Sequence, residues 1–192
     1  NLENFGIHLQ FGLGDTGRAI EMYLRALDAR PGDSLLLTRL AEAEGERGQP
    51  EAAEQYWRAA LDAEPNNAQT VAQYGAHLLE LDDDNRRGER MLQRALQIDP
   101  HNPTAHATLG ELAEARNDFA TADDHFSHAS VIPGPERIDM ITRYAAFLTD
   151  IGAYDRAVEV TNEGLTIDPS SLMLRELRAG LEVHQHRYAP AI

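Results

Sequence analysis

Two histidines in the stretch from Asp123 to His128 are the side chains best suited to metal chemistry. His125 and His128 stand three residues apart, so a helix places both imidazoles on one face beside an aspartate, as zinc or nickel ligands require. Such a site also needs a third ligand from a second element, and the sequence names none. The buried stripe of this helix falls instead on Ala122, Phe126 and Ala129. We therefore predict an exposed helix surface and no metal, with His125 and His128 as the candidate pair.

Four further histidines have structural or unassigned roles. His77 and His106 fall near the expected seam between paired helices, where a histidine is packed or hydrogen-bonded. His184 and His186 lie in the closing helix and are weaker metal candidates than the pair above.

A glycine pattern near the start resembles a nucleotide-binding loop. Gly12, Gly14 and Gly17 have the spacing of a dinucleotide-binding fingerprint, which must follow a β-strand inside a βαβ unit. No strand pattern precedes them, and Gly14 lies 34 residues before Gly48, which marks a turn between helices. We interpret these glycines as turn residues.

An acidic run later in the chain resembles the opening of a calcium loop. Arg86 stands where the run from Asp82 to Asn85 would need another ligand, and no glutamate closes the loop. We predict a solvated turn that also favours the start of the next helix, since negative charge is stabilising at a helix N-terminus.

Catalytic chemistry finds no support in the remaining residue types. The chain has no cysteine and no lysine, which removes thiolate, disulfide and Schiff-base chemistry and excludes a phosphate-binding P-loop. No serine stands beside a histidine in a nucleophile motif, and the paired carboxylates fall on solvated helix faces. We predict no catalytic residues, no enzymatic activity and no cofactor.

The charge balance restricts the partners. The 32 acidic residues outnumber 17 arginines, for a net charge of −15, so nucleic acid and anionic lipid are repelled. A GC-rich genome and adaptation to high salt both explain an acidic, lysine-free composition, and both stay open. No apolar run reaches the roughly 18 residues of a membrane span. With no signal peptide and Asn1 in place of methionine, the sequence is interpreted as an excerpt or a processed chain.

The elements that hold these residues repeat along the chain. Ala19, Tyr23, Ala26 and Pro31 precede Ala53, Trp57, Ala60 and Pro65 by 34 residues each. The same set recurs 35 residues later as Gly88, Leu92, Ala95 and Pro100. A large and small pair repeats as well, at Leu40-Ala41, Tyr74-Gly75, Leu109-Gly110 and Tyr144-Ala145, whereas Phe5-Gly6 is one residue out of register. Each period holds two amphipathic helices separated by a glycine or proline turn.

This pattern resembles the tetratricopeptide repeat family over nearly the whole chain. The resemblance implies an all-α fold, a right-handed superhelical solenoid of antiparallel helix pairs with about five units and a C-terminal capping helix. The predicted repeats are residues 1–33, 34–67, 68–102, 103–137 and 138–171. A cap at 172–186 completes one domain over 1–186, and a tail follows at 187–192.

In this family the first helix of each repeat lines a concave groove that holds a peptide or a partner helix. Carried over by position, the groove residues are Thr38, Arg39, Glu42, Glu46, Gln73, Ala76, Glu80, Thr104, Thr108, Glu111, Glu114, Asp139, Thr142, Arg143 and Asp150. Thr38 and Glu42 stand where the family's clamp for a C-terminal carboxylate has lysine and asparagine, which disfavours a receptor for such tails. Because seven of these residues are acidic and two are arginines, we expect a neutral or basic peptide or protein partner.

The resemblance implies a prokaryotic protein-interaction scaffold or adaptor. The alternative is a non-catalytic module of a larger enzyme, such as a glycosyltransferase or sulfotransferase, or of an envelope secretion or pilus-assembly machine. A soluble location in the cytoplasm or periplasm is expected, and self-association stays open.

Overall fold

The protein is helical throughout the part of the chain that can be described. In the computed structural model this part comprises residues 1–81, 85–134 and 136–188, and it contains no β-strand. The chain divides into two compact units, which we call unit 1 (Asn1–Pro100) and unit 2 (His101–Ile192). The acidic turn Asp82–Asp84 and the tail from residue 189 fall outside the described residues, as do the side chains of His184 and His186.

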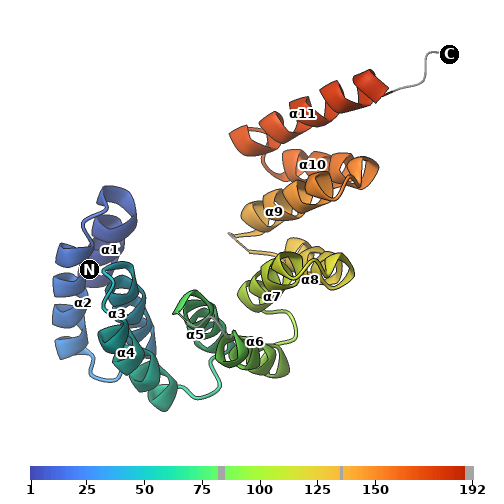
Figure 1. Cartoon of the computed structure of the whole chain (residues 1–192). Helices are drawn as coiled ribbons and strands as arrows, with labels where there is room; N and C mark the ends of the chain where they lie inside the picture. Colours follow the sequence, from blue (N-terminus) through green and yellow to red (C-terminus); the bar gives the residue numbers. More distant parts are fainter. Residues whose placement is uncertain (82–84, 135, 189–192) are drawn as a thin grey trace. The chain divides into compact units, whose positions relative to one another are not determined.

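The helices follow one another with short connections (Figure 1). Unit 1 contains α1 (Leu2–Ile7), the π-helix η1 (His8–Gly12), α2 (Thr16–Ala29), α3 (Ser34–Glu46), α4 (Pro50–Ala63), α5 (Ala68–Leu81) and α6 (Arg86–Ile98). Unit 2 contains α7 (Pro103–Ala115), α8 (Phe119–Val131), α9 (Arg137–Asp150), α10 (Tyr154–Ile167) and α11 (Leu172–Tyr188).

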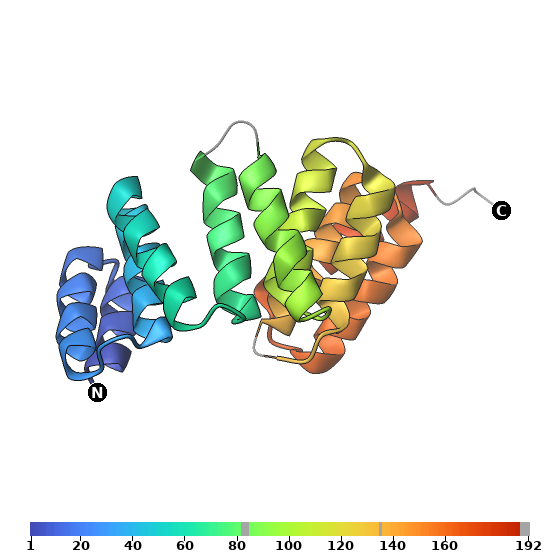
Figure 2. The same ribbon diagram turned by 90° about the horizontal axis from the view of Figure 1, so that it is seen from below.

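The helices pair as the repeat predicts. We call the first helix of each pair an A helix (α1 with η1, then α3, α5, α7 and α9) and the second a B helix (α2, α4, α6, α8 and α10). Within each unit the two helices of a pair lie side by side, as α3 with α4 and α9 with α10 show in Figures 1 and 2. The fold-class prediction of antiparallel helix pairs is confirmed, while one continuous domain over 1–186 stays a prediction.

Side-chain caps and turn residues set the ends of these helices. Asp33 and Asn102 each accept a hydrogen bond from the backbone N–H three residues later, at the start of α3 and α7. Pro50 opens α4, where its missing N–H costs nothing. The turns between paired helices place Gly48 and Asn117 at positive φ, a conformation that glycine and asparagine tolerate best. The backbone therefore turns in the same way in different repeats.

The π-helix explains the register of the first repeat. A π-helical turn holds one residue more than the α-helical turn it replaces. The turn His8–Gly12 lies between Gly6 and α2, and it absorbs the extra residue that sets Phe5-Gly6 out of register. The first A helix is therefore built from two elements, α1 and η1.

Small residues allow the helices of a pair to approach closely, and large ones fill the remaining space. A Cβ added to Gly88 would lie 2.7 Å from the backbone oxygen of Gly75, so α5 and α6 touch through their backbones. Between neighbouring pairs, the rings of Trp57 on α4 and Tyr74 on α5 stack with centroids 5.7 Å apart. In unit 2 the rings of Phe126 and Phe147 meet at 5.1 Å. Each unit thus has its own interior of interlocking large and small side chains.

Neighbouring pairs are also joined by a tyrosine, a carboxylate and an arginine. In unit 1 the hydroxyl of Tyr74 on α5 donates to Glu54 of α4 at 2.5 Å, and Arg87 of α6 donates to both. Burial alone would raise the pKa of Glu54, but hydrogen bonds from Tyr74, Arg58 and Arg87 outweigh it and lower that pKa.

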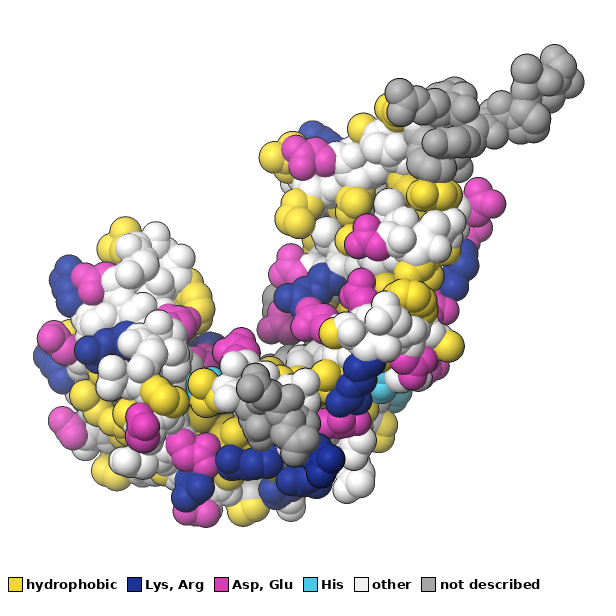
Figure 3. Space-filling model, viewed as in Figure 1, with side chains coloured by type: hydrophobic (Ala, Val, Ile, Leu, Met, Phe, Trp, Pro, Cys, Tyr) yellow, Lys and Arg dark blue, Asp and Glu magenta, His cyan; other side chains and the backbone are white. Residues whose placement is uncertain are grey.

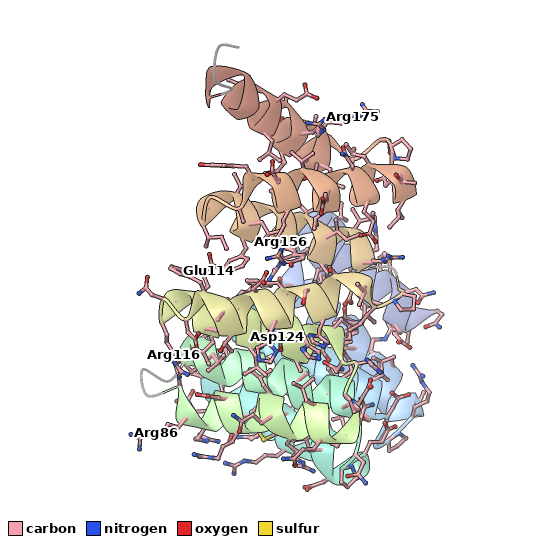
Figure 4. All side chains as sticks on the ribbon, turned by 90° about the vertical axis from the view of Figure 1, so that its right-hand side faces the viewer. Arg86, Glu114, Arg116, Asp124, Arg156 and Arg175 are labelled. Atoms are coloured by element: carbon pink, nitrogen blue, oxygen red, sulfur yellow. The ribbon has the colours of Figure 1, made fainter. Side chains whose placement is uncertain are left out.

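The same cluster recurs in unit 2, where each member follows its counterpart by 69 or 70 residues, two repeat lengths. There Tyr144 of α9 donates to Asp123 of α8 at 2.9 Å, and Arg156 of α10 binds both. Figure 4 labels Arg156, which reaches from α10 towards α8. Each cluster ties three helices together.

The glycine contact between α5 and α6 gives a first prediction. Gly88→Ala should destabilise the chain by about 1–3 kcal/mol, because the new methyl group meets backbone that cannot move aside. Gly180→Ala in α11 is the matched control: its Cβ would meet no heavy atom within 4 Å, so better helix propensity should add up to about 1 kcal/mol. Urea unfolding followed by circular dichroism measures both, and equal effects would contradict the packing.

The tyrosine clusters give a second prediction. Burial, followed by hydrogen bonding to a carboxylate, raises the pKa of both Tyr74 and Tyr144 to about 12 from an ordinary 10. The folded chain therefore holds these protons more tightly than the unfolded chain, so stability should fall as the pH rises from 10 towards 12.

Tyr74→Phe should cost about 1 kcal/mol at neutral pH, since one hydrogen bond is lost, and should flatten part of the alkaline decline. Urea unfolding at a series of alkaline pH values measures both effects. An unchanged slope in the variant would show that the hydroxyl is not bound as described.

Candidate functional site

The predicted groove residues of unit 1 lie on two neighbouring A helices. They are Thr38, Arg39, Glu42 and Glu46 on α3, with Gln73, Ala76 and Glu80 on α5. Of these, Glu46 and Glu80 are exposed, whereas Arg39, Glu42, Gln73 and Ala76 are half-buried. In either unit, we call the face of the A helices that carries the predicted residues the A-helix surface of that unit.

Glu42 joins the two helices in unit 1. Its carboxylate accepts a hydrogen bond from Gln73 of α5 at 2.6 Å and another from Arg39 of α3 at 3.0 Å. Burial raises the pKa of Glu42, and the nearby Arg39 guanidinium opposes that rise. Glu42 is therefore a fixed acceptor whose charge is partly balanced by Arg39.

Glu46 links α3 to the first repeat by hydrogen bonds, as Glu42 links α3 to α5. Its two oxygens accept from Gln10 of η1 at 2.8 Å and from Thr16 of α2 at 3.3 Å. The buried Gln10 in turn accepts from Tyr23 at 2.9 Å. Burial raises the pKa of Tyr23 to about 12, so this hydroxyl stays a donor at ordinary pH. Gln10 of the π-helix thus holds the carboxylate of Glu46 in place at the C-terminal end of α3.

Two of the predicted groove threonines are buried and act within the fold. Thr38 is 2% exposed and its hydroxyl lies 3.3 Å from that of Thr70, which links α3 to α5. Thr142 is 8% exposed and donates to the carbonyl of Ile138 in its own helix. Both side chains are almost fully buried, and both hydroxyls are engaged within the fold.

In unit 2 the predicted residues again lie on two A helices. They are Thr104, Thr108, Glu111 and Glu114 on α7, with Asp139, Thr142, Arg143 and Asp150 on α9. An ion pair between Arg143 and Glu111 links the two helices, as Glu42 and Gln73 link theirs in unit 1. Glu114, labelled in Figure 4, stands near the C-terminal end of α7.

A cleft opens between the N-terminal halves of α3 and α5. Its volume is about 480 Å³, and most of its lining residues have polar side chains, although polar and apolar atoms expose similar areas to it. The lining residues are Gly32, Asp33, Ser34, Leu35, Thr38, Glu64, Asn67, Gln69, Thr70 and Gln73. Sequence reasoning named only Thr38 and Gln73 from this set. The others cluster at the starts of α3 and α5, and the recurring caps Asp33 and Asn67 were the available signal.

The surface as a whole carries both signs of charge. On the face shown in Figure 3, acidic side chains lie beside arginines in each unit, with small apolar areas between them. Many arginines are paired with acids, among them Arg58 with Glu54 and Arg137 with Glu163. The excess of acids is therefore spread over the surface.

His125 and His128, which were both predicted to be exposed, differ in burial. His128 is exposed, but His125 is half-buried, and its Nδ1 atom lies 3.0 Å from Nδ1 of His106 on α7. The prediction was wrong for His125 because the turn of α8 that carries it faces α7. The structural role expected for His106 is confirmed by this contact, and His77 packs against Trp57 at 6.1 Å between ring centroids.

The described residues hold no group of three or more His, Asp or Glu side chains arranged for a metal ion. The same part of the chain includes no helix that is both long and apolar enough to cross a membrane.

Parts of the chain are similar in sequence to two curated proteins. No family model matches the chain. The cellulose synthase 2 operon protein C of Komagataeibacter xylinus is 32% identical over 114 residues, 59% of this chain and 7% of that protein. A TPR repeat-containing protein of Dictyostelium discoideum is 27% identical over 103 residues, 50% of this chain and 39% of that protein. The chain thus matches well under half the length of either relative.

Two solved structures share the fold over nearly the whole chain. A thermophilic TPR protein of Thermus thermophilus has a TM-score of 0.72 at 20% identity, covering 95% of this chain and 98% of its own. A chain of the APC/C hetero-tetramer Cut9–Hcn1 also has a TM-score of 0.72, at 16% identity, covering 96% of this chain and 36% of its own. Together with the repeat period and the paired helices, these likenesses establish that the chain has the tetratricopeptide repeat fold.

Proposed function

We propose that this chain is a protein-interaction module that binds an extended segment of a partner on its A-helix surface. The observation that carries the proposal is the polar cleft of about 480 Å³ between α3 and α5. Its volume lies in the range of ordinary binding pockets, and it opens among hydrogen-bonding side chains. Gln73 lines it, and while its amide nitrogen donates to Glu42, its amide oxygen can accept a hydrogen bond from a peptide backbone N–H.

The hydrogen bonds under this surface support a pre-organised site. Glu42, Glu46 and Gln73 are each fixed by a partner on a neighbouring element. A surface that is already ordered loses less entropy when it binds, so more of the contact energy appears as affinity.

The exposed charges of the A-helix surface favour a neutral or basic partner. Glu80, Asp139 and Asp150 are all exposed on this surface, within a chain whose net charge is −15. Opposite charges across an interface speed encounter and fix the register of the bound segment, whereas an acidic segment would be repelled.

A scaffold role is also supported by a solved structure that has the same fold. The Cut9–Hcn1 structure is a hetero-tetramer, so one neighbour of this fold is found assembled with another protein. We infer a non-catalytic role for this chain, in line with the absence of a nucleophile motif in its sequence.

A second role follows from the lengths of the relatives. Because the chain spans 7% and 39% of the two curated relatives, it corresponds to one module within longer proteins. The likeness to a cellulose synthase operon protein favours a non-catalytic module of polysaccharide-synthesis or envelope machinery. This role is compatible with peptide binding, since such a module acts by holding a partner.

The proposal is tested by selecting a random peptide library displayed on phage against the purified chain. The enriched peptides should be neutral or basic, and their affinity, measured by fluorescence anisotropy, should weaken as salt is added.

A charge-reversal pair then locates the site. Glu64→Lys combined with Glu80→Lys changes the cleft lining and the A-helix surface of unit 1, whereas Glu21→Lys with Asp62→Lys makes the same charge change at exposed positions on the B helices α2 and α4. The first pair should weaken the selected peptides about tenfold or more, and the second should change affinity far less. Equal losses in the two pairs, enrichment of acidic peptides, or binding that tightens with salt would each refute the proposal.

A further inference from the structure

Three histidine rings meet where α7 packs against α8. His106 of α7 is 7% exposed, and its ring centroid lies 5.2 Å from that of His125 and 5.0 Å from that of His128. The rings of His106 and His128 are stacked, with only 8° between their planes. The cluster therefore crosses the interface between the two helices of the fourth repeat, within unit 2.

The contact between His106 and His125 restricts their protonation. Their Nδ1 atoms are 3.0 Å apart, so one nitrogen must carry the hydrogen and the other must offer its lone pair. At least one of the two rings is then neutral while the contact exists. His128 differs, since its Nδ1 lies 2.7 Å from the carbonyl oxygen of Asp124 and can donate to it in either charge state.

The charges around the cluster come from a small set of groups. Those acting on His125 are His106 from α7, and His128 and Asp124 from its own helix. Asp124, labelled in Figure 4, is exposed and 3.7 Å from His128. The neighbouring Asp123 is engaged instead with Tyr144 of α9 and Arg156 of α10.

On α9, which also packs on α8, Asp139 and Asp150 are exposed, and the two arginines are engaged elsewhere. Arg137 pairs with Glu163, and Arg143 pairs with Glu111. A proton added to His125 therefore meets the imidazoles of His106 and His128 and the exposed carboxylate of Asp124.

We propose that His106, His125 and His128 form a proton-sensitive clasp, closed at neutral pH and opened by protonation, that controls how firmly α7 is held against α8. When both His106 and His125 are charged, the Nδ1 contact is lost and two like charges face each other across a partly buried interface. The device works on the helix pair itself and does not depend on what the A-helix surface binds.

The direction of the effect follows from the protonation equilibrium. Burial first, and then the neighbouring His106, lower the pKa of His125 below its ordinary value of 6.5. The unfolded or opened pair therefore binds protons more readily than the closed pair. Stability of the closed state is lost as the pH falls below 6.5 and continues to fall towards the lowered pKa of the folded chain.

Hydrogen exchange of the full chain, followed by mass spectrometry at about pH 7.5 and about pH 5.5, tests the clasp. After correction for the intrinsic rate at each pH, peptides from α7 and α8 should lose about tenfold of their protection at the lower pH. Peptides from α2 and α3, which contain no histidine, should change little.

Two variants separate the clasp from general acid sensitivity. His125→Gln keeps a hydrogen-bonding group beside His106 but cannot gain a charge, so the loss of protection should shrink to less than about threefold. His8→Gln, which removes an exposed histidine of unit 1, should keep the full loss.

The result that overturns the proposal is protection of α7 and α8 that is independent of pH, or that responds equally in His125→Gln and in the unchanged chain. If His125→Gln does not fold by circular dichroism, an imidazole titration by NMR decides the matter on the unchanged chain. His106 and His125 becoming charged together above pH 6.5 would then exclude the clasp.

Discussion

Close approach of paired helices through small side chains is the constraint on which the rest of this structure depends. Where α5 meets α6, Gly75 and Gly88 leave so little room that an added Cβ would touch backbone oxygen. Once two helices are that close, their large residues have to pack over the small ones, as Leu92 of α6 does against Gly75 of α5. The recurrence of small and large residues at a fixed interval is therefore a packing requirement, and it selects helix pairs over any other fold.

Polar side chains then fix how successive pairs are joined within each unit. A buried tyrosine hydroxyl needs an acceptor, and the carboxylate that accepts from it needs a cation. Tyr74 with Glu54 and Arg87 satisfies both needs in unit 1, and Tyr144 with Asp123 and Arg156 does so in unit 2. In each tie the A helix contributes its tyrosine, and the carboxylate and the arginine come from B helices. Other polar side chains of the A helices form the surface proposed to bind a partner.

Most of the fold could be predicted from the sequence because its signals are local. Proline and glycine mark the turns, as Pro50 and Gly48 do, and the spacing of alanines and aromatics marks the buried stripes. The register slip at Phe5-Gly6 was visible too, although the sequence alone did not reveal that a π-helical turn would absorb it. Helix boundaries and pairing follow from such patterns without knowledge of any distant contact.

The candidate site was less predictable because it depends on small rotations of a helix about its axis. Positions carried over from a repeat family cannot separate the buried Thr38 from the half-buried Arg39, which differ by one residue. The contact of His125 with His106 could not be predicted for a similar reason, since the two residues lie 19 positions apart on facing helices. Sequence spacing locates a side chain on a helix, whereas packing decides what that side chain meets.

The most direct measurement of the central claim is a nuclear Overhauser experiment on the chain in solution, aimed at the α-protons of Gly75 and Gly88. Backbones in contact at this point should give a clear cross-peak between these protons. Absence of that cross-peak, in a chain whose circular dichroism shows it to be folded, would show that small residues do not bring α5 and α6 together and would contradict the account.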